Sequence, residues 1–505
     1  MTVLNCCESK ALARLGQGMK ITMAKWLFPV LATVLAGCAA SNKPINAPLQ
    51  NAQNTPVTQV SSRDLADDSL FIGLAFSGGG HRASSFSYGM LKALQSVDRS
   101  PSNPHGLLPH VRLVTGVSGG SVTAAWFGFS GPAGMNGFRE RYLTQNAEKY
   151  MANSPFNPLT IARGLSGGAN GRKTFGRFLN EALFNNATFA DLARRSKIIT
   201  WINAADVAHK TSFLFSPETF DALCSDLSRL PISEAVAASA AFPLVFSPIV
   251  LQAHSNDCNY QEPDWLTAAR YNPEATSTLR AYGDVIERYS DPEKVKFVKL
   301  LDGGTTDNFG TVALAVERAK AQNAYGPLTA EQAVRVERIL FLVANSGTES
   351  EYGWTQKVGG PGGVALAMSI VNSSMSSATR TAYDAMVLTL NDWHSDVVEF
   401  RCSLSSSEVR RLRGSTSGWD CRNLKLFVSE VTFQGLDDDM VDQLNEIPTR
   451  LKLPVEQVDL AIEAGLQATR QDPEFNGFLR SIGLTGPAIG DAAGATPRLI
   501  RPNQN

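Results

Sequence analysis

A serine stands at the centre of the segment Gly116-Val117-Ser118-Gly119-Gly120, which matches the pattern Gly-x-Ser-x-Gly. Small flanking residues allow a sharp turn that presents the serine hydroxyl group at the N-terminus of a following helix. The backbone N–H groups and the dipole of that helix favour developing negative charge. The pattern therefore indicates a nucleophile, and an ordinary turn built from small residues is the alternative.

A serine nucleophile needs a base, and Asp302 is the candidate for that role. It follows an apolar run and precedes Gly303 and Gly304. A carboxylate at the end of its own strand can accept the proton of Ser118. The alternative for Asp302 is an aspartate turn before a helix, which is a common local structure.

A third glycine-rich segment, Ser77-Gly78-Gly79-Gly80-His81-Arg82-Ala83, also follows an apolar run. Successive glycines expose backbone N–H groups that can hold a carbonyl oxyanion or a phosphate. The same residues fit Gly-x-Gly-x-x-Ala, a dinucleotide-binding pattern, but that function requires an acidic residue about 20 residues further on, at the end of the second strand. Here the second strand ends in Thr115 and Gly116, so the segment predicts an anion cradle.

Strands and helices that would position these motifs alternate along the chain. Their alternation predicts a parallel sheet with helices on both faces. Ligands of such sheets bind beyond the carboxyl ends of the strands, where all three motifs are expected, so we predict a single active site. The expected strands are 71–76, 111–115, 197–206, 296–301, 338–344 and 424–432, and the expected helices are 83–96, 120–129, 232–241, 311–322, 455–470 and 473–482.

Taken together and in this order, the three motifs resemble those of the patatin-like phospholipase family. In that family a glycine-rich loop, a Gly-x-Ser-x-Gly turn and an Asp-Gly-Gly/Ala motif build a Ser–Asp dyad without histidine. Ala237–Pro243 is similar to the family's Ala-Ser-x-Ala-x-Pro segment, and Asp307–Gly310 is similar to its Asp-Asn-hydrophobic-Gly run. The resemblance covers about residues 70–315. Ser77–Ala83 is closer to cytosolic phospholipases of the superfamily than to plant members, which leaves substrate preference open.

The resemblance implies a three-layer α/β/α fold with a mainly parallel central sheet, and it implies no metal and no cofactor. Ser118 would attack an ester carbonyl of a membrane phospholipid or another acyl-ester lipid. Asp302 would act as general base and return the proton to the leaving alcohol. The N–H groups of Gly78–Gly80 would hold the oxyanion, and Arg82 would orient this loop or contact a lipid phosphate. Water would then release a fatty acid from the acyl-enzyme.

Three other functions stay open at this point. One is a Ser–His–Asp esterase in which His394 is the base. Another is a catalytically silent lipoprotein that binds lipid or acts as a scaffold. A third is acyl transfer in place of hydrolysis. His81 adjoins the glycine loop and is expected to make a loop contact, and Arg82 has an ordinary ion pair as its alternative role.

The N-terminal region has the features of a secretory signal. Lys20 and Lys25 precede the apolar run Trp26–Leu35, which is too short to span a bilayer comfortably. The run leads into Leu35-Ala36-Gly37-Cys38, which resembles the bacterial lipoprotein signal, in which the cysteine is lipidated and becomes the first mature residue. An ordinary signal or an uncleaved apolar anchor is the alternative, and Met19 or Met23 can be the true start.

Lipidation at Cys38 would place the protein in the bacterial cell envelope. Ala39 follows the cysteine where inner-membrane lipoproteins usually carry Asp, so the resemblance favours the outer membrane. Several acyl chains on one cysteine would hold the protein firmly, since single chains bind only marginally. The polar stretch 42–62 is rich in Asn, Gln, Pro, Ser and Thr, which is typical of a flexible tether.

Composition limits the partners and the compartment. The 505 residues carry a formal net charge of −1, which excludes a basic surface of the kind that binds nucleic acid. Cys224, Cys258, Cys402 and Cys421 remain in the body, and an even count in an oxidising compartment allows two disulfides. Proximity in the sequence favours 224–258 and 402–421, and buried free thiols are the alternative.

These features predict one large α/β body with a leader and a tail, and they leave the oligomeric state open. The expected parts are a signal peptide at 1–37, a tether at 38–68, a catalytic core at 69–325 with insertions at about 155–190 and 254–292, an extension at 326–485 that completes the body, and a tail at 486–505.

Overall fold

A computed structural model describes residues 42–49, 69–152, 160, 163–164, 167–348 and 353–484 of the chain. Its centre is one eight-stranded sheet in the order β5-β6-β3-β2-β1-β7-β8, with β4 paired to β3. The strands are β1 Leu70–Phe76, β2 Val111–Val117, β3 Ile199–Asp206, β4 Thr211–Leu214, β5 Ile249–Gln252, β6 Phe297–Asp302, β7 Arg338–Ala344 and β8 Lys425–Val431.

The middle of the sheet is parallel, as the sequence predicts. Strands β8, β7, β1, β2 and β3 are all parallel to their neighbours in this order. The expectation that all three motifs follow strands of this parallel set is wrong for β6, which is antiparallel to β3. Strand β6 pairs with the part of β3 that extends past β2, because Val117 pairs with Asn203 and Asp302 pairs with Ala204. Asp302 therefore reaches the level of Ser118 from the opposite direction.

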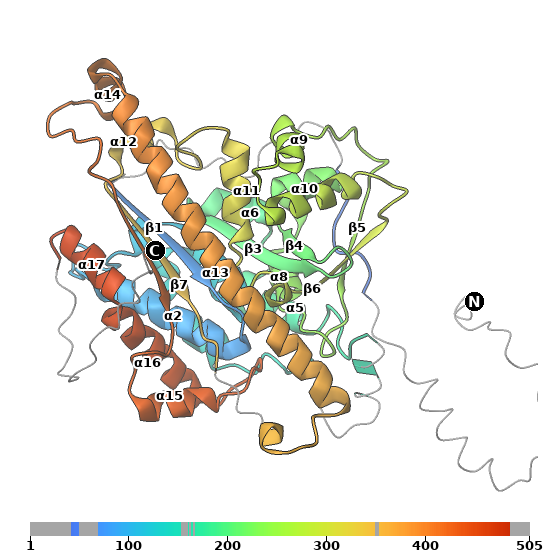
Figure 1. Ribbon diagram of the computed structural model, residues 1–505. Helices are drawn as coiled ribbons and strands as arrows, with labels where there is room; N and C mark the ends of the chain where they lie inside the picture. The colour runs from blue at the N-terminus through green and yellow to red at the C-terminus, as the bar shows by residue number, and fades with distance from the viewer. Residues whose placement is uncertain are drawn as a thin grey trace, which may run out of the picture.

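Helices cover both faces of the sheet, which gives the three-layer α/β/α fold (Figure 1). The alternation of side chains along β1 shows the two interfaces, since successive side chains of a strand point to opposite faces. Ile72, Leu74 and Phe76 join one hydrophobic core with α2, α3 and α16. Phe71 and Ala75 join a second core with β7 and α13.

The helices differ widely in length, from single turns to the 41 residues of α13. The α-helices are α2 Gly80–Ser96, α3 Gly119–Ser130, α5 Phe175–Leu179, α6 Phe189–Arg195, α7 Pro217–Ala222, α8 Ile232–Ser239, α9 Asp264–Tyr271, α10 Ser277–Tyr289, α11 Val312–Ala321, α12 Ala330–Arg335, α13 Gly363–Ser403, α14 Ser406–Arg413, α15 Asp438–Asn445, α16 Val455–Gln471 and α17 Pro473–Ser481. Short 3-10 and π turns are η2 Leu108–His110, η3 Pro132–Met135, η4 Arg139–Leu143, η5 Asn180–Phe184, η6 Leu227–Arg229, η7 Gly303–Thr305 and η8 Gly353–Gln356.

The chain after residue 325 is built into the same body. Strand β7 pairs along its whole length with β1, and β8 pairs with β7. On one face α16 packs against α2, and the two helices approach closely at glycines. A Cβ atom at Gly465 would lie 2.0 Å from the carbonyl oxygen of Phe86. On the other face α13 runs diagonally across the sheet (Figure 1).

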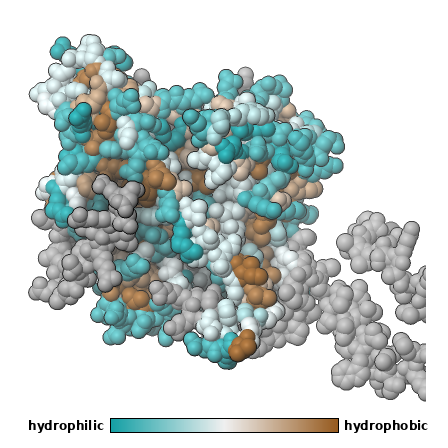
Figure 2. Space-filling view, viewed as in Figure 1, coloured by the Kyte–Doolittle hydropathy of each residue, from teal (hydrophilic) through white to brown (hydrophobic). Residues whose placement is uncertain are grey.

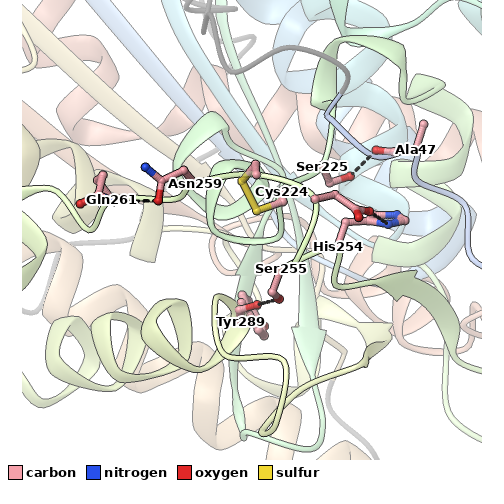
Figure 3. The surroundings of a disulfide bond; sticks show 10 residues. Ala47, Cys224, Ser225, His254, Ser255, Asn259, Gln261 and Tyr289 are labelled. Atoms are coloured by element: carbon pink, nitrogen blue, oxygen red, sulfur yellow. Dashed lines mark hydrogen bonds and ion pairs between the residues drawn. A yellow bond between two sulfur atoms is a disulfide. The ribbon is translucent and has the colours of Figure 1, made fainter.

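Disulfides join Cys224 to Cys258 and Cys402 to Cys421, the two pairings that proximity in the sequence favours. The first fixes the start of the insertion at 254–292 to the end of α7 (Figure 3). The insertion folds as α9 and α10, and Tyr282 and Tyr289 of α10 are fully buried.

Residues 42–49, expected to belong to a flexible tether, lie against the body instead. The Asn42 amide group donates hydrogen bonds to the carbonyl oxygens of Ser247 and Pro248, at 3.2 and 2.8 Å. The Ile45 N–H group donates to the carbonyl oxygen of Val250 in β5. The Ser225 hydroxyl group donates to the carbonyl oxygen of Ala47 beside the first disulfide (Figure 3). Asparagine side chains make most of these contacts, so a polar composition did not prevent docking.

Candidate active site

The turn at Ser118 has the backbone geometry of a nucleophile elbow. Ser118 joins β2 to α3 with φ 52° and ψ −123°, a conformation that non-glycine residues rarely adopt. Its glycine neighbours are required by close packing. A Cβ atom at Gly119 would lie 1.9 Å from the carbonyl oxygen of Gly80, and one at Gly120 would lie 2.4 Å from that of Phe76. The elbow is therefore pressed directly against the glycine loop.

The hydroxyl group of Ser118 adjoins the carboxyl group of Asp302 closely enough to lower its pKa. The carboxyl group is buried, and its Oδ1 atom accepts the N–H group of Gly304 at 2.9 Å. Burial raises the pKa of Asp302 from 3.8 to about 6, although the Ser118 hydroxyl group and the Gly304 N–H group act in the opposite direction. The carboxylate is thus a stronger base than an exposed aspartate, and it faces the serine that it would deprotonate.

The last residue of α8 and the segment that follows it hold both members of this pair. Ser118 donates its N–H group to the hydroxyl oxygen of Ser239 at 2.9 Å, and Ser239 donates to the carbonyl oxygen of Asn203 at 2.6 Å. Asp302 donates its N–H group to the carbonyl oxygen of Ala241 at 3.0 Å. The stretch Ala237–Pro243, noted in the sequence only for its resemblance, thereby sets the spacing of the pair.

The glycine loop lies beside Ser118, with one difference from expectation. A Cβ atom at Gly78 would lie 3.2 Å from the Ser118 Cβ atom, so the loop adjoins the serine. The Gly78 N–H group, however, donates to the side-chain oxygen of Asn308 at 3.0 Å. Gly79 has φ 138°, and Gly80, with φ 63°, is the first residue of α2. The N–H group of a first helical residue has no acceptor within its helix and is available to a ligand.

Arg82 contacts other groups of the protein, whereas one expectation was a contact with a lipid phosphate. Its guanidinium group is buried and donates to the carbonyl oxygens of Ser346, at 3.0 Å, and Ile447. It also donates to the Thr449 hydroxyl oxygen at 3.4 Å. Burial lowers the pKa of Arg82 to about 10. These bonds occupy the side chain and join the loop to Ser346 and to the segment around residues 447–449.

Neither of the two candidate histidines reaches Ser118 as a base. His81 is fully buried, its Nε2 atom lies 3.3 Å from the carbonyl oxygen of Tyr142, and burial lowers its pKa to about 4. His394 bonds the carbonyl oxygen of Leu424 at 3.0 Å, beside the amino end of β8. Thr379 marks the point where α13 passes the site, and His394 lies 15 residues further along, or about 22 Å at 1.5 Å per residue.

Sequence patterns gave no role to four side chains that complete the site, those of Ser239, Asn308, Met375 and Thr379. The Asn308 amide group donates to the Thr379 hydroxyl oxygen at 3.0 Å while its oxygen accepts the Gly78 N–H group. A Cβ atom at Gly304 would lie 2.5 Å from the terminal carbon of Met375. Asn308 and Ser239 stood inside segments recognised by resemblance. Thr379 and Met375 lie more than 60 residues downstream on α13, with no local signal that connects them to the dyad.

Comparison with known proteins agrees with the motifs. A sequence model described as "Patatin-like phospholipase" matches residues 74–315, a range that contains the glycine loop, Ser118 and Asp302. Residues 74–315 are a patatin-like phospholipase domain. The strands of the patatin-like domain, β1 to β6, all fall within or at the border of this range, and β7 and β8 extend its sheet.

Solved structures similar to this chain include human GIVD cytosolic phospholipase A2, at 13% identity and a TM-score of 0.36, with 93% of this chain and 65% of the human chain covered. The same human enzyme in complex with methyl gamma-linolenyl fluorophosphonate matches at 14% identity and a TM-score of 0.34, with 92% and 64% covered. This chain thus spans about two thirds of the human chain's length, and the likeness is too distant to support a statement about function. Among curated proteins, none matches the chain.

Cys38, the signal at 1–37 and the tail at 486–505 lie outside the described residues. Within the described ranges, no helix is long and apolar enough to cross a membrane. In the same ranges, no group of three or more His, Cys, Asp or Glu side chains is placed to hold a metal ion.

Proposed function

We propose that the protein is a lipid acyl-ester hydrolase that works through a Ser118–Asp302 dyad and an acyl-enzyme. The observation that carries the proposal is the burial of the Asp302 carboxyl group beside the Ser118 hydroxyl group, which raises the pKa of that carboxyl group to about 6. A general base is most effective when its pKa is not far from the working pH. The match of residues 74–315 to patatin-like phospholipases supports an ester of a fatty acid as substrate.

In the proposed reaction the Ser118 oxygen attacks the ester carbonyl carbon while its proton passes to the Asp302 carboxylate. The negative oxygen of the tetrahedral intermediate accepts hydrogen bonds from the N–H groups of Gly79 and Gly80, because Gly78 is engaged by Asn308. Protonated Asp302 then gives its proton to the leaving alcohol. Asp302 then deprotonates a water molecule that attacks the acyl-enzyme carbonyl carbon, and it returns this proton to the Ser118 oxygen as the bond to the fatty acid breaks.

The chain is also proposed to be a lipoprotein held at the bacterial outer membrane through Cys38. The sequence Leu35-Ala36-Gly37-Cys38 and the following Ala39 support this location. Two disulfides in the body are consistent with an oxidising compartment. Replacing Cys38 by serine should abolish incorporation of labelled fatty acid, whereas replacing Cys6 and Cys7 should not. Labelling that survives in Cys38→Ser would exclude this anchor.

Lipid product analysis on a mixed phospholipid panel tests the enzymatic proposal. The wild-type protein should release fatty acid, and Ser118→Ala and Asp302→Asn should each lose at least about 1,000-fold in rate. His394→Ala is the matched control and should retain full activity. Full activity in Asp302→Asn would refute the dyad. New esters formed with added acceptor alcohols would indicate acyl transfer, and failure of a fluorophosphonate to label folded wild type would indicate a catalytically silent protein.

A further inference from the structure

The first turns of α13 are the part of this long helix that the body does not bury. The first buried side chain of α13 is Thr379, and burial then recurs along one face at Met386, Leu390, Trp393 and Val397. Every side chain described between Gly363 and Ala378 is exposed or half-buried. About 24 Å of helix, at 1.5 Å per residue, therefore precedes the anchored part.

From Gly363 to Val371 these exposed turns are apolar on both sides apart from Ser369, and residues 372–377 are mostly serine. Leu366 is 45% exposed and Ile370 is 61% exposed, and their four-residue spacing puts them on one face. Met368, Val371 and Met375 form the opposite, half-buried face. Figure 2 shows apolar residues gathered over the lower end of α13. An apolar helical surface is normally covered, and the described residues of this chain leave Leu366 and Ile370 exposed.

Charge is absent from the same stretch. No Asp, Glu, Lys, Arg or His occurs from Val358 to Thr379, and the run is bounded by Lys357 and Arg380, both exposed. The hydroxyl group of Ser369 donates to the carbonyl oxygen of Ala365 at 2.9 Å, which satisfies its polarity within the helix. An uncharged apolar surface with a cation at each end suits the boundary between acyl chains and anionic headgroups.

The exposed turns adjoin the catalytic pair. Met375 packs on Gly304, two residues from Asp302, and Thr379 bonds the Asn308 side chain that holds Gly78. Leu366 lies nine residues before Met375, or about 14 Å along the helix. A lipid in contact with the exposed turns would therefore have its ester bond a short distance from Ser118.

The proposed anchor reaches the body on the side that carries Asp302. Asn42 bonds Ser247 and Pro248, which lead into β5, and the first residue of β5, Ile249, pairs with Leu300, two residues before Asp302. Cys38 is four residues before Asn42, and four residues of chain span at most about 14 Å. A lipidated Cys38 would thus keep the membrane surface close to this end of β6.

We propose that the exposed residues Val358, Leu366 and Ile370 form a membrane-docking surface that lies in the interface of a lipid bilayer and delivers lipid to the dyad. The inference rests on the proposed lipid hydrolase function. The helix lies in the interface and does not cross it, since no helix among the described residues is apolar and long enough to do so.

Paired hydrolysis assays test the consequence for activity. The double variant Leu366→Ser/Ile370→Ser should hydrolyse phospholipid in phosphatidylethanolamine–phosphatidylglycerol vesicles at least about tenfold more slowly. It should hydrolyse a soluble short-chain ester within twofold of wild type, because the dyad is untouched. Leu388→Ser is the matched control, since Leu388 is 65% exposed on the same helix but about 33 Å from Leu366. Equal losses in the control, or an unchanged vesicle rate in the double variant, would overturn the proposal.

Fluorescence quenching tests the contact itself without any catalysis. Ser118→Ala protein with Cys6, Cys7 and Cys38 replaced by serine would carry Ile370→Cys or, as control, Leu388→Cys, labelled with a bimane fluorophore. Brominated phospholipid vesicles should quench the label at 370 and not at 388. Equal or absent quenching at 370 would exclude docking even if the lipase proposal holds, and quenching at 370 would support docking even if wild type hydrolyses nothing. Protection of 370 by dimerisation without vesicles would identify a second copy as the occupant and overturn the proposal.

Discussion

Burial of one carboxyl group determines how this site handles protons. Asp302 has no cationic partner among the causes that shift its pKa, so desolvation dominates and the pKa rises to about 6. A pKa near 6 leaves the carboxylate ionised at neutral pH, ready to accept the Ser118 proton, and makes its protonated form a usable acid for the leaving alcohol. A histidine is not needed to obtain this balance.

The pH dependence of activity should follow the ionisation of Asp302 alone. The rate constant kcat/KM for a soluble ester should rise with pH through one limb with a midpoint near 6, since only ionised Asp302 can accept the serine proton. Steady-state assays between pH 4.5 and 8.5 measure it. The profile should be the same in His394→Ala. A midpoint that shifts, or a pH dependence that disappears, in His394→Ala would indicate that His394 takes part in the mechanism.

Removing the charge should stabilise the protein while it inactivates the enzyme. The pKa of Asp302 is raised from 3.8 unfolded to about 6 folded, so its contribution to stability is fully present below pH 3.8 and is lost as pH rises through 6. By linkage, ionisation of this carboxyl group lowers the free energy of unfolding at neutral pH by about 3 kcal/mol relative to its value below pH 3.8. Asp302→Asn should therefore raise the free energy of unfolding by up to about this amount at pH 7.5 and by little at pH 4. Urea denaturation at both pH values measures the difference, and an unstabilised variant at pH 7.5 would show that the native carboxylate is well solvated.

Elements were easier to predict from the sequence than the directions in which they run. The apolar runs at 71–76 and 111–115 became β1 and β2, because buried parallel strands are continuous apolar segments. Strands β4 and β5 have only four residues each and carry no distinct pattern. Nothing in residues 297–302 reveals that β6 runs antiparallel to β3, because pairing direction depends on distant chain. The whole of α13 was missed, and at its start the apolar residues follow no single face.

Asn308 should link α13 to the glycine loop, which is proposed to hold the oxyanion. Its side chain joins the Gly78 N–H group to the Thr379 hydroxyl group, and all three groups are buried. Asn308→Ala removes both bonds and leaves the Gly78 N–H group without its acceptor, which costs about 1–3 kcal/mol. Because the loop would lose its position, we expect kcat to fall by about 10- to 100-fold with a smaller change in KM. Thr379→Val removes the bond from Asn308 and the bond from Thr379 to the Met375 carbonyl oxygen but keeps the bond to Gly78, so it should have a weaker effect in the same assay. An Asn308→Ala enzyme with wild-type kcat would contradict the link.

Over the whole molecule, a disulfide and hydrogen bonds attach the outlying segments to the body that surrounds one sheet. The disulfide Cys224–Cys258 fixes the insertion, and residues 42–49 pack beside it (Figure 3). The pairings were predictable because the four cysteines fall into two close pairs in the sequence. The docking of 42–49 was not, since it depends on carbonyl oxygens of Ser247, Pro248 and Val250 that only the folded body presents.

Loss of either disulfide should lower stability without abolishing the dyad. The bridges are separated by 34 and 19 residues, and the chain-entropy relation gives each about 3–4 kcal/mol by restricting the unfolded state. We expect Cys224→Ser/Cys258→Ser to lose slightly more free energy of unfolding than Cys402→Ser/Cys421→Ser, because its loop is longer. Urea unfolding with and without a reductant measures this, and the double variants should be insensitive to the reductant at the bridge they lack.

Both double variants should retain hydrolysis of a soluble ester under folding conditions, because Ser118 and Asp302 are positioned by Ser239, Ala241 and Gly304. Loss of ester hydrolysis in a folded Cys402→Ser/Cys421→Ser protein would contradict this expectation. It would mean that the end of α13 near Cys402 affects the geometry of the site along the helix. The hydrogen bonds at Asn308 and Thr379 do not by themselves account for such an effect.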